Sequence, residues 1–204
     1  MARPPLQPIE VERFRQRLCE VALQRFAEDG FAGVTLRALA RDLGCSYATP
    51  YRYFRDKEHI FAAVRALAYE RFGAALESAA IGETDPERRL RLMTATFVRF
   101  AKEEPQAYRM MFELHQPDPD LHPEYWSKER QTWFIWEDEI RRAVDAGVLI
   151  GDPPVVAHLF WSGIHGVVAL HLAGKLILGR KLEELAAPMI EALMIAHDPN
   201  QRKD

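Results

Sequence analysis

Residues 35–57 constrain the fold of this chain more than any other stretch. Thr35 is a suitable N-cap, and an apolar helical face follows it at the i, i+3, i+4 and i+7 positions: Leu36, Leu39, Ala40 and Leu43. Gly44 can adopt the positive φ that ends a helix sharply, and Ser46 can cap a second helix shortly afterwards. Two helices joined by so short a turn cross at a steep angle. The stretch therefore predicts a helix-turn-helix.

The second of these helices, predicted over residues 47–53, carries phenols, a hydroxyl, a guanidinium and a small methyl group. They belong to Tyr47, Ala48, Thr49, Tyr51, Arg52 and Tyr53. Phenols and hydroxyls bind phosphate oxygens, arginine binds phosphate or guanine, and a small side chain can rest on a thymine methyl. A merely solvated helix face would carry Glu and Lys instead. The pattern favours a helix that contacts double-stranded DNA.

Two residues after this helix have predicted structural roles. Phe54 is the expected anchor to the core, and Asp56 is the expected N-cap of the next helix. Lys57 then lies at a helix N-terminus, a position that already favours an anion such as phosphate.

Residues 12–61 resemble the DNA-binding domain of the TetR family of transcriptional regulators. The matching stretches are residues 22–31 (Ala-Leu-Gln-Arg-Phe-Ala-Glu-Asp-Gly-Phe), residues 34–40 (Val-Thr-Leu-Arg-Ala-Leu-Ala) and residues 51–58 (Tyr-Arg-Tyr-Phe-Arg-Asp-Lys-Glu). The resemblance implies DNA contacts by Thr35, Arg37, Ser46, Tyr47, Ala48, Thr49, Tyr51, Arg52, Tyr53 and Lys57. Most of these would touch phosphate, with Arg37, Tyr47 and Ala48 as the base readers.

Pro50 departs from the family pattern, which usually has Leu, Val or Ile at this position. Proline removes one N–H and crowds the carbonyl four residues earlier, here that of Ser46. The cost is modest if Ser46 is the N-cap and the first turn is 3₁₀-like. Tyr53 also replaces the more usual His. These departures predict an atypical base preference. They also keep open an alternative, an all-α sensor or carrier of small molecules that no longer binds DNA specifically.

Composition places the chain among soluble globular proteins. It has 204 residues, 48% hydrophobic and 28% charged, with a net charge of −3, so a wholly basic nucleic-acid coat is excluded. No apolar run approaches the length of a membrane span, and the N-terminus lacks a secretion signal. The two cysteines, Cys19 and Cys45, fit a reducing compartment. We expect a cytoplasmic protein without a membrane partner.

Hydrophobic periodicity predicts an all-α fold with about nine helices and no strand. Residues 1–8 are expected to form a proline-rich arm, and residues 115–123 a loop. Helices are expected near residues 10–29, 35–43, 47–53, 57–79, 86–104, 106–112, 124–146, 153–172 and 182–197. The predicted domains are a helix-turn-helix module over residues 1–60 and a helical bundle for ligand binding and dimerisation over residues 61–204.

Residues 161–172 are hydrophobic all round, as in a helix buried in a core or against a partner. With the last helix they can form a face that meets its copy as a four-helix bundle. The region resembles the WHG-type C-terminal domain of TetR-like regulators, which implies a homodimer that binds a palindrome. The expected interface residues are Gly163, Gly166, Val167, Leu170, Leu185, Met189 and Leu193.

Large aromatic and Met side chains are concentrated between residues 97 and 165, where they either fill the core or line a pocket for an apolar effector. The expected ligand residues are Phe97, Phe100, Met111, Phe112, Trp126, Trp133, Trp161 and His165. A polar group of that ligand would meet His165 or Arg109.

Other classes of site are not supported by the sequence. The seven histidines have no spacing that completes a metal shell, so no metal and no cofactor is expected. No glycine-rich phosphate loop, HExxH or nucleophile elbow is present, so we expect no enzyme activity.

Overall fold

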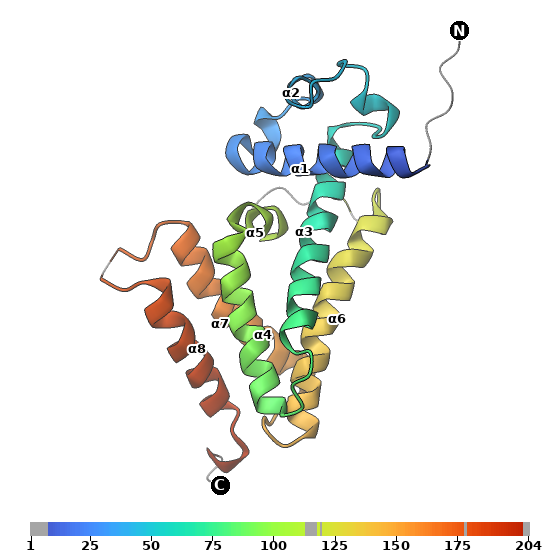
Figure 1. Cartoon of the computed structure of the whole chain (residues 1–204). Helices are drawn as coiled ribbons and strands as arrows, with labels where there is room; N and C mark the ends of the chain where they lie inside the picture. The colour runs from blue at the N-terminus through green and yellow to red at the C-terminus, as the bar shows by residue number, and fades with distance from the viewer. Residues whose placement is uncertain (1–7, 113–117, 119, 178, 202–204) are drawn as a thin grey trace. The chain divides into compact units, whose positions relative to one another are not determined.

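The computed structural model describes residues 8–112, 118, 120–177 and 179–201, and these residues form an all-α fold with no strand (Figure 1). The predicted fold class is confirmed, and the residues just given contain eight α-helices and two short 3₁₀ helices. In chain order they are α1 (Pro8–Gly33), α2 (Leu36–Asp42), η1 (Pro50–Arg52), α3 (Lys57–Ala79), α4 (Pro86–Glu103), α5 (Pro105–Phe112), α6 (Pro123–Asp145), α7 (Pro153–Leu172), α8 (Leu182–Ala196) and η2 (Pro199–Gln201).

The chain divides into two compact units. Unit 1 comprises residues 1–70 and 106–129, and unit 2 comprises residues 71–105 and 130–204. The helices α3 and α6 each contribute residues to both units. The predicted domain boundary at residue 60 stays a prediction. The predicted N-terminal arm, apart from Pro8, and residues 115–117 and 119 of the predicted loop over residues 115–123 lie outside the described residues.

Side-chain caps fix the helix starts where the sequence predicted them. The Thr35 hydroxyl accepts from the Ala38 N–H at 3.2 Å, the Asp56 carboxylate from His59 at 2.8 Å, and the Asp85 carboxylate from Arg88 at 3.0 Å. Each cap satisfies one of the N–H groups that a first turn leaves without a partner. In α1 the helical conformation breaks at Gly30, whose φ is 67°, and one more turn follows up to Gly33.

The predicted helix over residues 47–53 is wrong. Residues 47–49 form turns, and only Pro50–Arg52 is helical, as the 3₁₀ helix η1. The Thr49 N–H donates to the Ser46 carbonyl at 2.8 Å and the Arg52 N–H to the Thr49 carbonyl at 3.1 Å. Because these hydrogen bonds join residues three apart, the Ser46 carbonyl accepts from Thr49 and does not need the N–H that Pro50 lacks. Pro50 therefore shortens the helix without leaving a backbone acceptor unmatched.

Unit 1 packs the N-terminal helices around an aromatic core. Phe26 of α1 meets Phe61 of α3 edge to face, with ring centroids 4.9 Å apart, and Leu39 of α2 is fully buried. Arg25 of α1 donates to the carboxylate of Asp42 in α2 at 2.6 Å. This hydrogen bond with the guanidinium lowers the pKa of Asp42. The core and the ion pair together fix α2 against α1.

In unit 2, α7 and α8 lie side by side and both contact α4 (Figure 1). The ring of Phe97 lies at the centre of this unit, 5.1 Å from Phe72 and 6.2 Å from Trp136 between centroids. The Trp136 indole N–H donates to the Ala157 carbonyl at 3.0 Å, which ties α6 to α7. Aromatic burial therefore accounts for much of this core.

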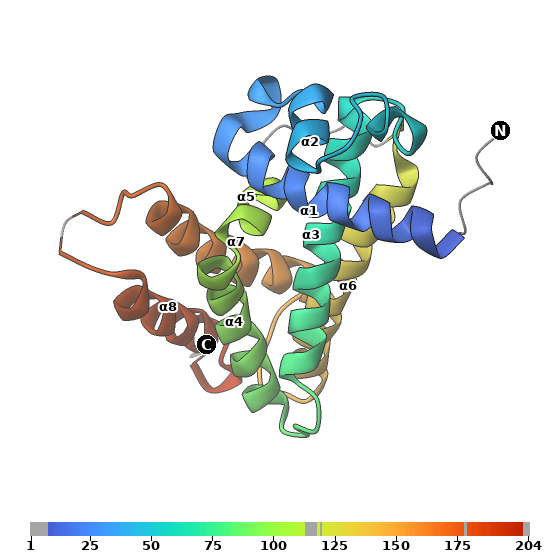
Figure 2. The same ribbon diagram turned by 45° about the horizontal axis from the view of Figure 1, so that its top comes forward.

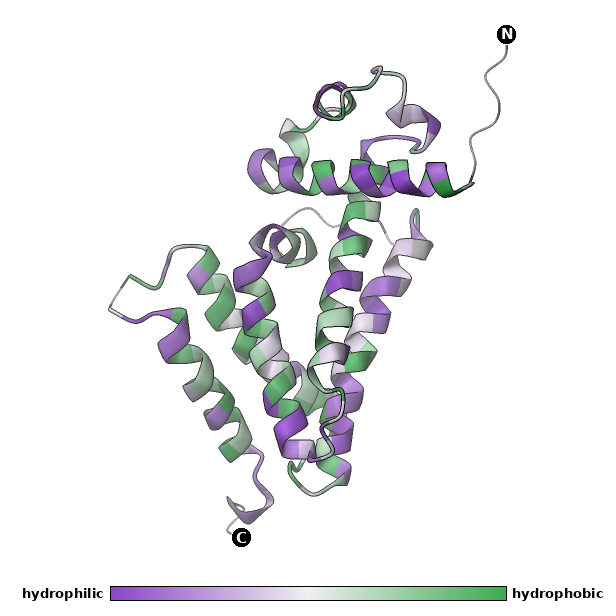
Figure 3. Cartoon of the chain, in the orientation of Figure 1, coloured by the Kyte–Doolittle hydropathy of each residue, from purple (hydrophilic) through white to green (hydrophobic). Residues whose placement is uncertain are grey.

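The sequence predicts no apolar run as long as a membrane span, and α7 corrects this expectation. By length and composition alone this helix could cross a membrane, a test that core helices of soluble proteins also pass. Its exposed apolar side chains include Val155, Leu159 and Leu170. Much of α8 also consists of hydrophobic residues, shown in green in Figure 3. These two helices thus leave an apolar surface uncovered within a single chain.

Candidate nucleic-acid interface

The turn after α2 is built by two backbone hydrogen bonds. The Cys45 N–H donates to the Ala40 carbonyl at 2.9 Å and the Gly44 N–H to the Arg41 carbonyl at 3.0 Å. Gly44 has a φ of 66°, a conformation that costs glycine little because it lacks a Cβ. This pairing ends α2 and redirects the chain into residues 46–53, which we call the recognition segment.

Most of the exposed side chains in the recognition segment are polar. Tyr47 is 64% exposed and Tyr51 58% exposed, and Ser46, Ala48 and Arg52 are exposed as well. Pro50 is buried, and so is Phe54, directly after the segment, as the sequence predicted. The buried pair holds the segment to the unit while the phenols of Tyr47 and Tyr51 face solvent.

The start of α2 adds two more exposed groups to this surface. Thr35 and Arg37 are exposed, and the Arg37 guanidinium carbon lies 5.9 Å from the centroid of the Tyr47 ring. The first turn of α2 therefore lies beside the recognition segment, on the side of unit 1 that comes forward in Figure 2. A guanidinium next to phenols and hydroxyls is a donor-rich surface suited to phosphates and base edges.

Three predicted DNA-contacting residues are only partly exposed. Thr49 and Tyr53 are half-buried, and the Tyr53 ring stacks on Phe14 with centroids 4.3 Å apart. The Lys57 ammonium donates to the Phe31 carbonyl at 2.7 Å and lies 4.2 Å from the centre of the Phe31 ring. A DNA contact by Lys57 would require its ammonium to share or leave this carbonyl.

Arg15 of α1 holds the recognition segment in place, a role that the sequence did not reveal. Its guanidinium donates to the Tyr53 carbonyl at 2.9 Å and covers the Phe54 ring at 4.5 Å. It also donates to the Tyr125 hydroxyl at 3.2 Å, and that hydroxyl lies 3.0 Å from the His59 Nε2. Because Arg15 and Tyr125 are far apart in sequence, no local pattern links them.

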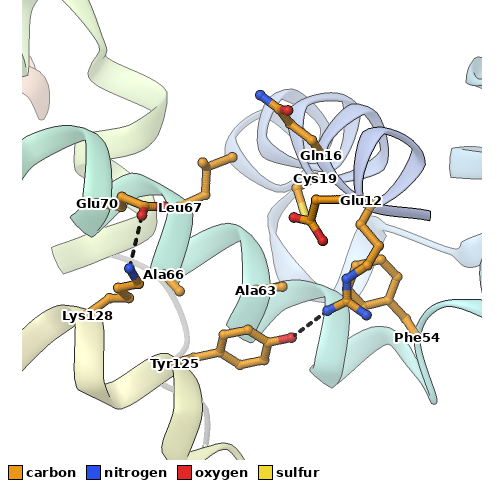
Figure 4. Close-up of a pocket in the computed structure, with 11 residues that line it drawn as sticks. Glu12, Gln16, Cys19, Phe54, Ala63, Ala66, Leu67, Glu70, Tyr125 and Lys128 are labelled. Atoms are coloured by element: carbon orange, nitrogen blue, oxygen red, sulfur yellow. Dashed lines mark hydrogen bonds and ion pairs between the residues drawn. The ribbon is translucent and has the colours of Figure 1, made fainter. Parts of the chain in front are cut away.

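A pocket of about 410 Å³ lies in unit 1 between α1, α3 and α6 (Figure 4). Its apolar wall includes Cys19, Phe54 and Leu67, and an ion pair between Lys128 and Glu70 at 2.9 Å forms part of its polar wall. The volume falls within the range of small-molecule sites. None of the eight predicted ligand residues lines this pocket.

The two cysteines should differ in reactivity. Burial raises the pKa of the Cys19 thiol to about 12, whereas Cys45 is only half-buried in the turn. Thiolate is the reactive form, so at pH 8 a thiol reagent should label one cysteine per chain quickly and both after unfolding. Mass spectrometry of the labelled peptides, with Cys45→Ser as the control, checks this. Equal labelling rates would contradict it.

The structure separates the predicted ligand residues into two groups. Met111, Phe112 and Trp126 belong to unit 1, and the other five belong to unit 2. There, Phe97 and Phe100 are buried in the core, while Trp133, Trp161 and His165 form a half-buried aromatic row. Burial lowers the pKa of His165, so its imidazole favours the neutral form. Their contact with a ligand stays a prediction.

The predicted dimer residues also differ in their surroundings. A Cβ on Gly163 would lie 3.1 Å from Leu193 and 3.2 Å from Met189, so this glycine permits close packing of α7 on α8 within the chain. A Cβ on Gly166 would meet nothing within 4 Å, and Leu170 is 48% exposed. Val167 is buried and Leu185 half-buried. Gly166 and Leu170 thus lie on the outward side of α7.

The described part of the chain contains no group of three or more His, Cys, Asp or Glu residues that could hold a metal ion.

Two family models match the chain. Residues 18–64 match the model of bacterial regulatory proteins of the tetR family, which spans the helix-turn-helix and the recognition segment. Residues 90–193, about half of the chain, match the tetracyclin repressor-like C-terminal domain.

Curated relatives and solved structures agree with these matches. The chain is 29% identical to the transcriptional repressor AcnR of Corynebacterium efficiens over 153 residues, which cover 72% of this chain and 74% of that one. It is also 29% identical to the repressor KstR of Mycolicibacterium smegmatis, but over only 45% of either chain. A TetR-family regulator from Marinobacter aquaeolei shares the fold, with a TM-score of 0.71 and 21% identity over 92% of this chain and 98% of that one. The chain therefore belongs to the TetR family, whose members are DNA-binding transcriptional regulators rather than enzymes.

Proposed function

We propose that the protein is a cytoplasmic repressor that binds a palindromic operator as a homodimer and is released by a mostly apolar small molecule. The observation that carries the proposal is the outward presentation of Tyr47, Tyr51 and Arg37 above the buried anchors Pro50 and Phe54. The repressor names of two relatives support the direction of regulation. A carrier that has lost DNA binding would have no use for this exposed donor surface.

Binding to DNA that flanks the protein's own gene tests the proposal. We expect a sequence-specific complex whose affinity falls steeply with salt, because a dimer that contacts several phosphates releases a counterion at each. Fluorescence anisotropy between roughly 50 and 200 mM salt should show a loss on the order of 10³-fold or more. A complex that forms equally on unrelated DNA would favour the alternative of a sensor that no longer binds DNA specifically.

Single substitutions in the recognition segment should separate phosphate contacts from base contacts. Tyr51→Phe removes one hydroxyl and should weaken binding on every DNA sequence about tenfold, the value of one hydrogen bond to a charged group. Tyr47→Phe should instead change the preference between operator variants. Anisotropy on a panel of single-base variants checks both. Equal effects of the two substitutions on all sequences would contradict the assignment.

Effector binding should weaken DNA binding through α3, which contributes residues to both units. A ligand that shifts the tilt of α3 would change the separation of the two recognition segments in the dimer. By linkage, DNA must weaken ligand binding by the same factor as the ligand weakens DNA binding. A ligand that binds tightly in calorimetry and leaves operator affinity unchanged would exclude this coupling.

A further inference from the structure

The pocket between α1, α3 and α6 in unit 1 belongs to none of the sites predicted from the sequence. It measures about 410 Å³, and no residue predicted to contact DNA, a ligand or a second chain lines it. All the residues that line it belong to unit 1. Ala63 and Ala66 lie one turn apart on α3, and their short side chains leave space that larger ones would fill. Together with Leu67 they form an apolar wall suited to a small molecule.

Two of the charged side chains that line this pocket already form a pair. Lys128 and Glu70 form an ion pair at 2.9 Å, so their charges balance each other. The Cys19 thiol adds no charge at neutral pH, because burial raises its pKa to about 12. The charges that remain open in the lining are the carboxylate of Glu12 and the guanidinium of Arg15.

Neither of these two groups has a counter-ion in the part of the chain that the structure describes. The exposed Glu12 side chain forms no hydrogen bond or ion pair with the described residues, and its carboxylate points from α1 toward Ala63 of α3 (Figure 4). The half-buried Arg15 donates to two neutral oxygens, the Tyr53 carbonyl and the Tyr125 hydroxyl, at 2.9 and 3.2 Å. A guanidinium has five N–H groups, so these two hydrogen bonds leave donors available.

The positions of the two charges select the kind of ligand. Residues three apart on a helix lie on one face, with Cβ atoms roughly 5–6 Å apart, so Glu12 and Arg15 are neighbours on α1. A ligand with only a carboxylate would be attracted by Arg15 and repelled by Glu12, and a ligand with only an ammonium would meet the reverse. A zwitterion whose ammonium and carboxylate share one carbon has a partner for each charge, and its apolar substituent fits the alanine-lined wall.

We propose that this pocket binds a free α-amino acid with a large apolar side chain, whose carboxylate pairs with Arg15 and whose ammonium pairs with Glu12. The site acts on the recognition segment, because Arg15 and Phe54 both line the pocket and Arg15 holds the Tyr53 carbonyl. A carboxylate is a stronger acceptor for a guanidinium than a carbonyl, so the bound ligand draws Arg15 from the segment and lowers operator affinity. For this regulatory consequence the inference rests on the proposed function.

Calorimetric titration of the full-length protein with three indole compounds tests the site. L-tryptophan carries both charges, tryptamine lacks the carboxylate, and indole-3-propionate lacks the ammonium. L-tryptophan should bind about tenfold more tightly than tryptamine, the value of a charged hydrogen bond to the half-buried Arg15. Its advantage over indole-3-propionate should be roughly threefold to fivefold, because Glu12 is exposed. If either single-charge compound binds as tightly as L-tryptophan, or if none of the three binds, the proposal is overturned.

Matched substitutions on α1 locate the partner of the ammonium. Glu12→Gln keeps the size of an exposed side chain and removes its charge. It should abolish the advantage of L-tryptophan over indole-3-propionate and preserve the advantage over tryptamine. Glu28→Gln is the control, because Glu28 is also an exposed carboxylate on α1 but does not line the pocket, and it should change neither ratio. An advantage over indole-3-propionate that survives Glu12→Gln overturns the proposal, and thermal unfolding verifies that both variants fold.

Operator binding with and without L-tryptophan is measured separately, so that this inference and the proposed function can fail independently. Saturating L-tryptophan should weaken operator binding. If L-tryptophan binds with the expected dependence on Glu12 while no operator complex forms, the proposed function fails and the site stands. If an operator is bound while L-tryptophan does not bind, the site fails and the proposed function stands. Operator affinity that is unchanged or raised in saturating L-tryptophan overturns the regulatory role of the site.

Discussion

Leu170→Glu is expected to convert the proposed homodimer into a monomer and to abolish tight operator binding. Leu170 is 48% exposed on the outward side of α7, where Gly166 also leaves open space. A charge placed in the middle of an apolar interface must be desolvated without a partner, which strongly disfavours association. A monomer keeps one recognition segment and loses the gain from simultaneous binding to two half-sites, roughly 10²–10⁴-fold in affinity.

Analytical ultracentrifugation and anisotropy on the palindrome check this expectation together. Ile81→Glu is the matched control, because Ile81 is also an exposed apolar residue but lies in the loop between α3 and α4. This control should remain dimeric and bind DNA normally. A Leu170→Glu protein that stays dimeric with unchanged operator affinity would exclude α7 from the interface.

Arg89→Met is expected to destabilise the protein by about 3–5 kcal/mol, which corresponds to roughly 6–20 °C in Tm for a chain of this size. Arg89 donates from Nε and Nη2 to both carboxylate oxygens of Glu139, at 3.0 and 2.9 Å, and Glu139 is only 3% exposed. Arg89 also donates to the carbonyls of Ala80 and Glu83. Removing the arginine leaves a buried carboxylate without its counter-ion and takes one hydrogen-bond donor away from each of two carbonyls.

Two further variants isolate the cause of this loss. Arg91→Met, on the same helix, removes exposed ion pairs with Glu87 and Glu191 and should cost less than about 1 kcal/mol. The double variant Arg89→Met/Glu139→Met removes both charges and should recover much of the lost stability. Thermal and urea unfolding measure all three. A double variant as unstable as Arg89→Met would show that the carbonyl contacts, not the buried charge, dominate.

The helix boundaries could be predicted because local chemistry sets them. Thr35, Asp56 and Asp85 each cap a helix within three residues of the N–H they bind, so sequence alone contains both partners. The helix length after Gly44 could not be predicted in the same way. The effect of Pro50 on the turn was anticipated, but the end of η1 depends on burial of Phe54 and on the contact of Tyr53 with Phe14.

The sequence predicted the recognition segment better than contacts between distant helices, because only the former is built from residues that are close in sequence. The exposed residues of the recognition segment lie within one short stretch of sequence, residues 46–52, so its composition was informative. The cluster of Arg65, Tyr69 and Glu129 joins α3 to α6 across 60 residues or more, and no sequence period links them. One signal was present: a single arginine in the otherwise apolar run from Ile60 to Ala66 is unusual in a buried helix.

The most direct test of the central claim is a hydroxyl-radical footprint of the wild-type protein on the DNA that flanks its own gene. Two recognition segments presented outward by a dimer should protect two half-sites about one helical turn apart, on the order of 34–36 Å, or a multiple of that spacing. Tyr47→Ala should remove or shift both protected regions together. No protection, or protection of a single half-site that Tyr47→Ala leaves intact, would contradict the account.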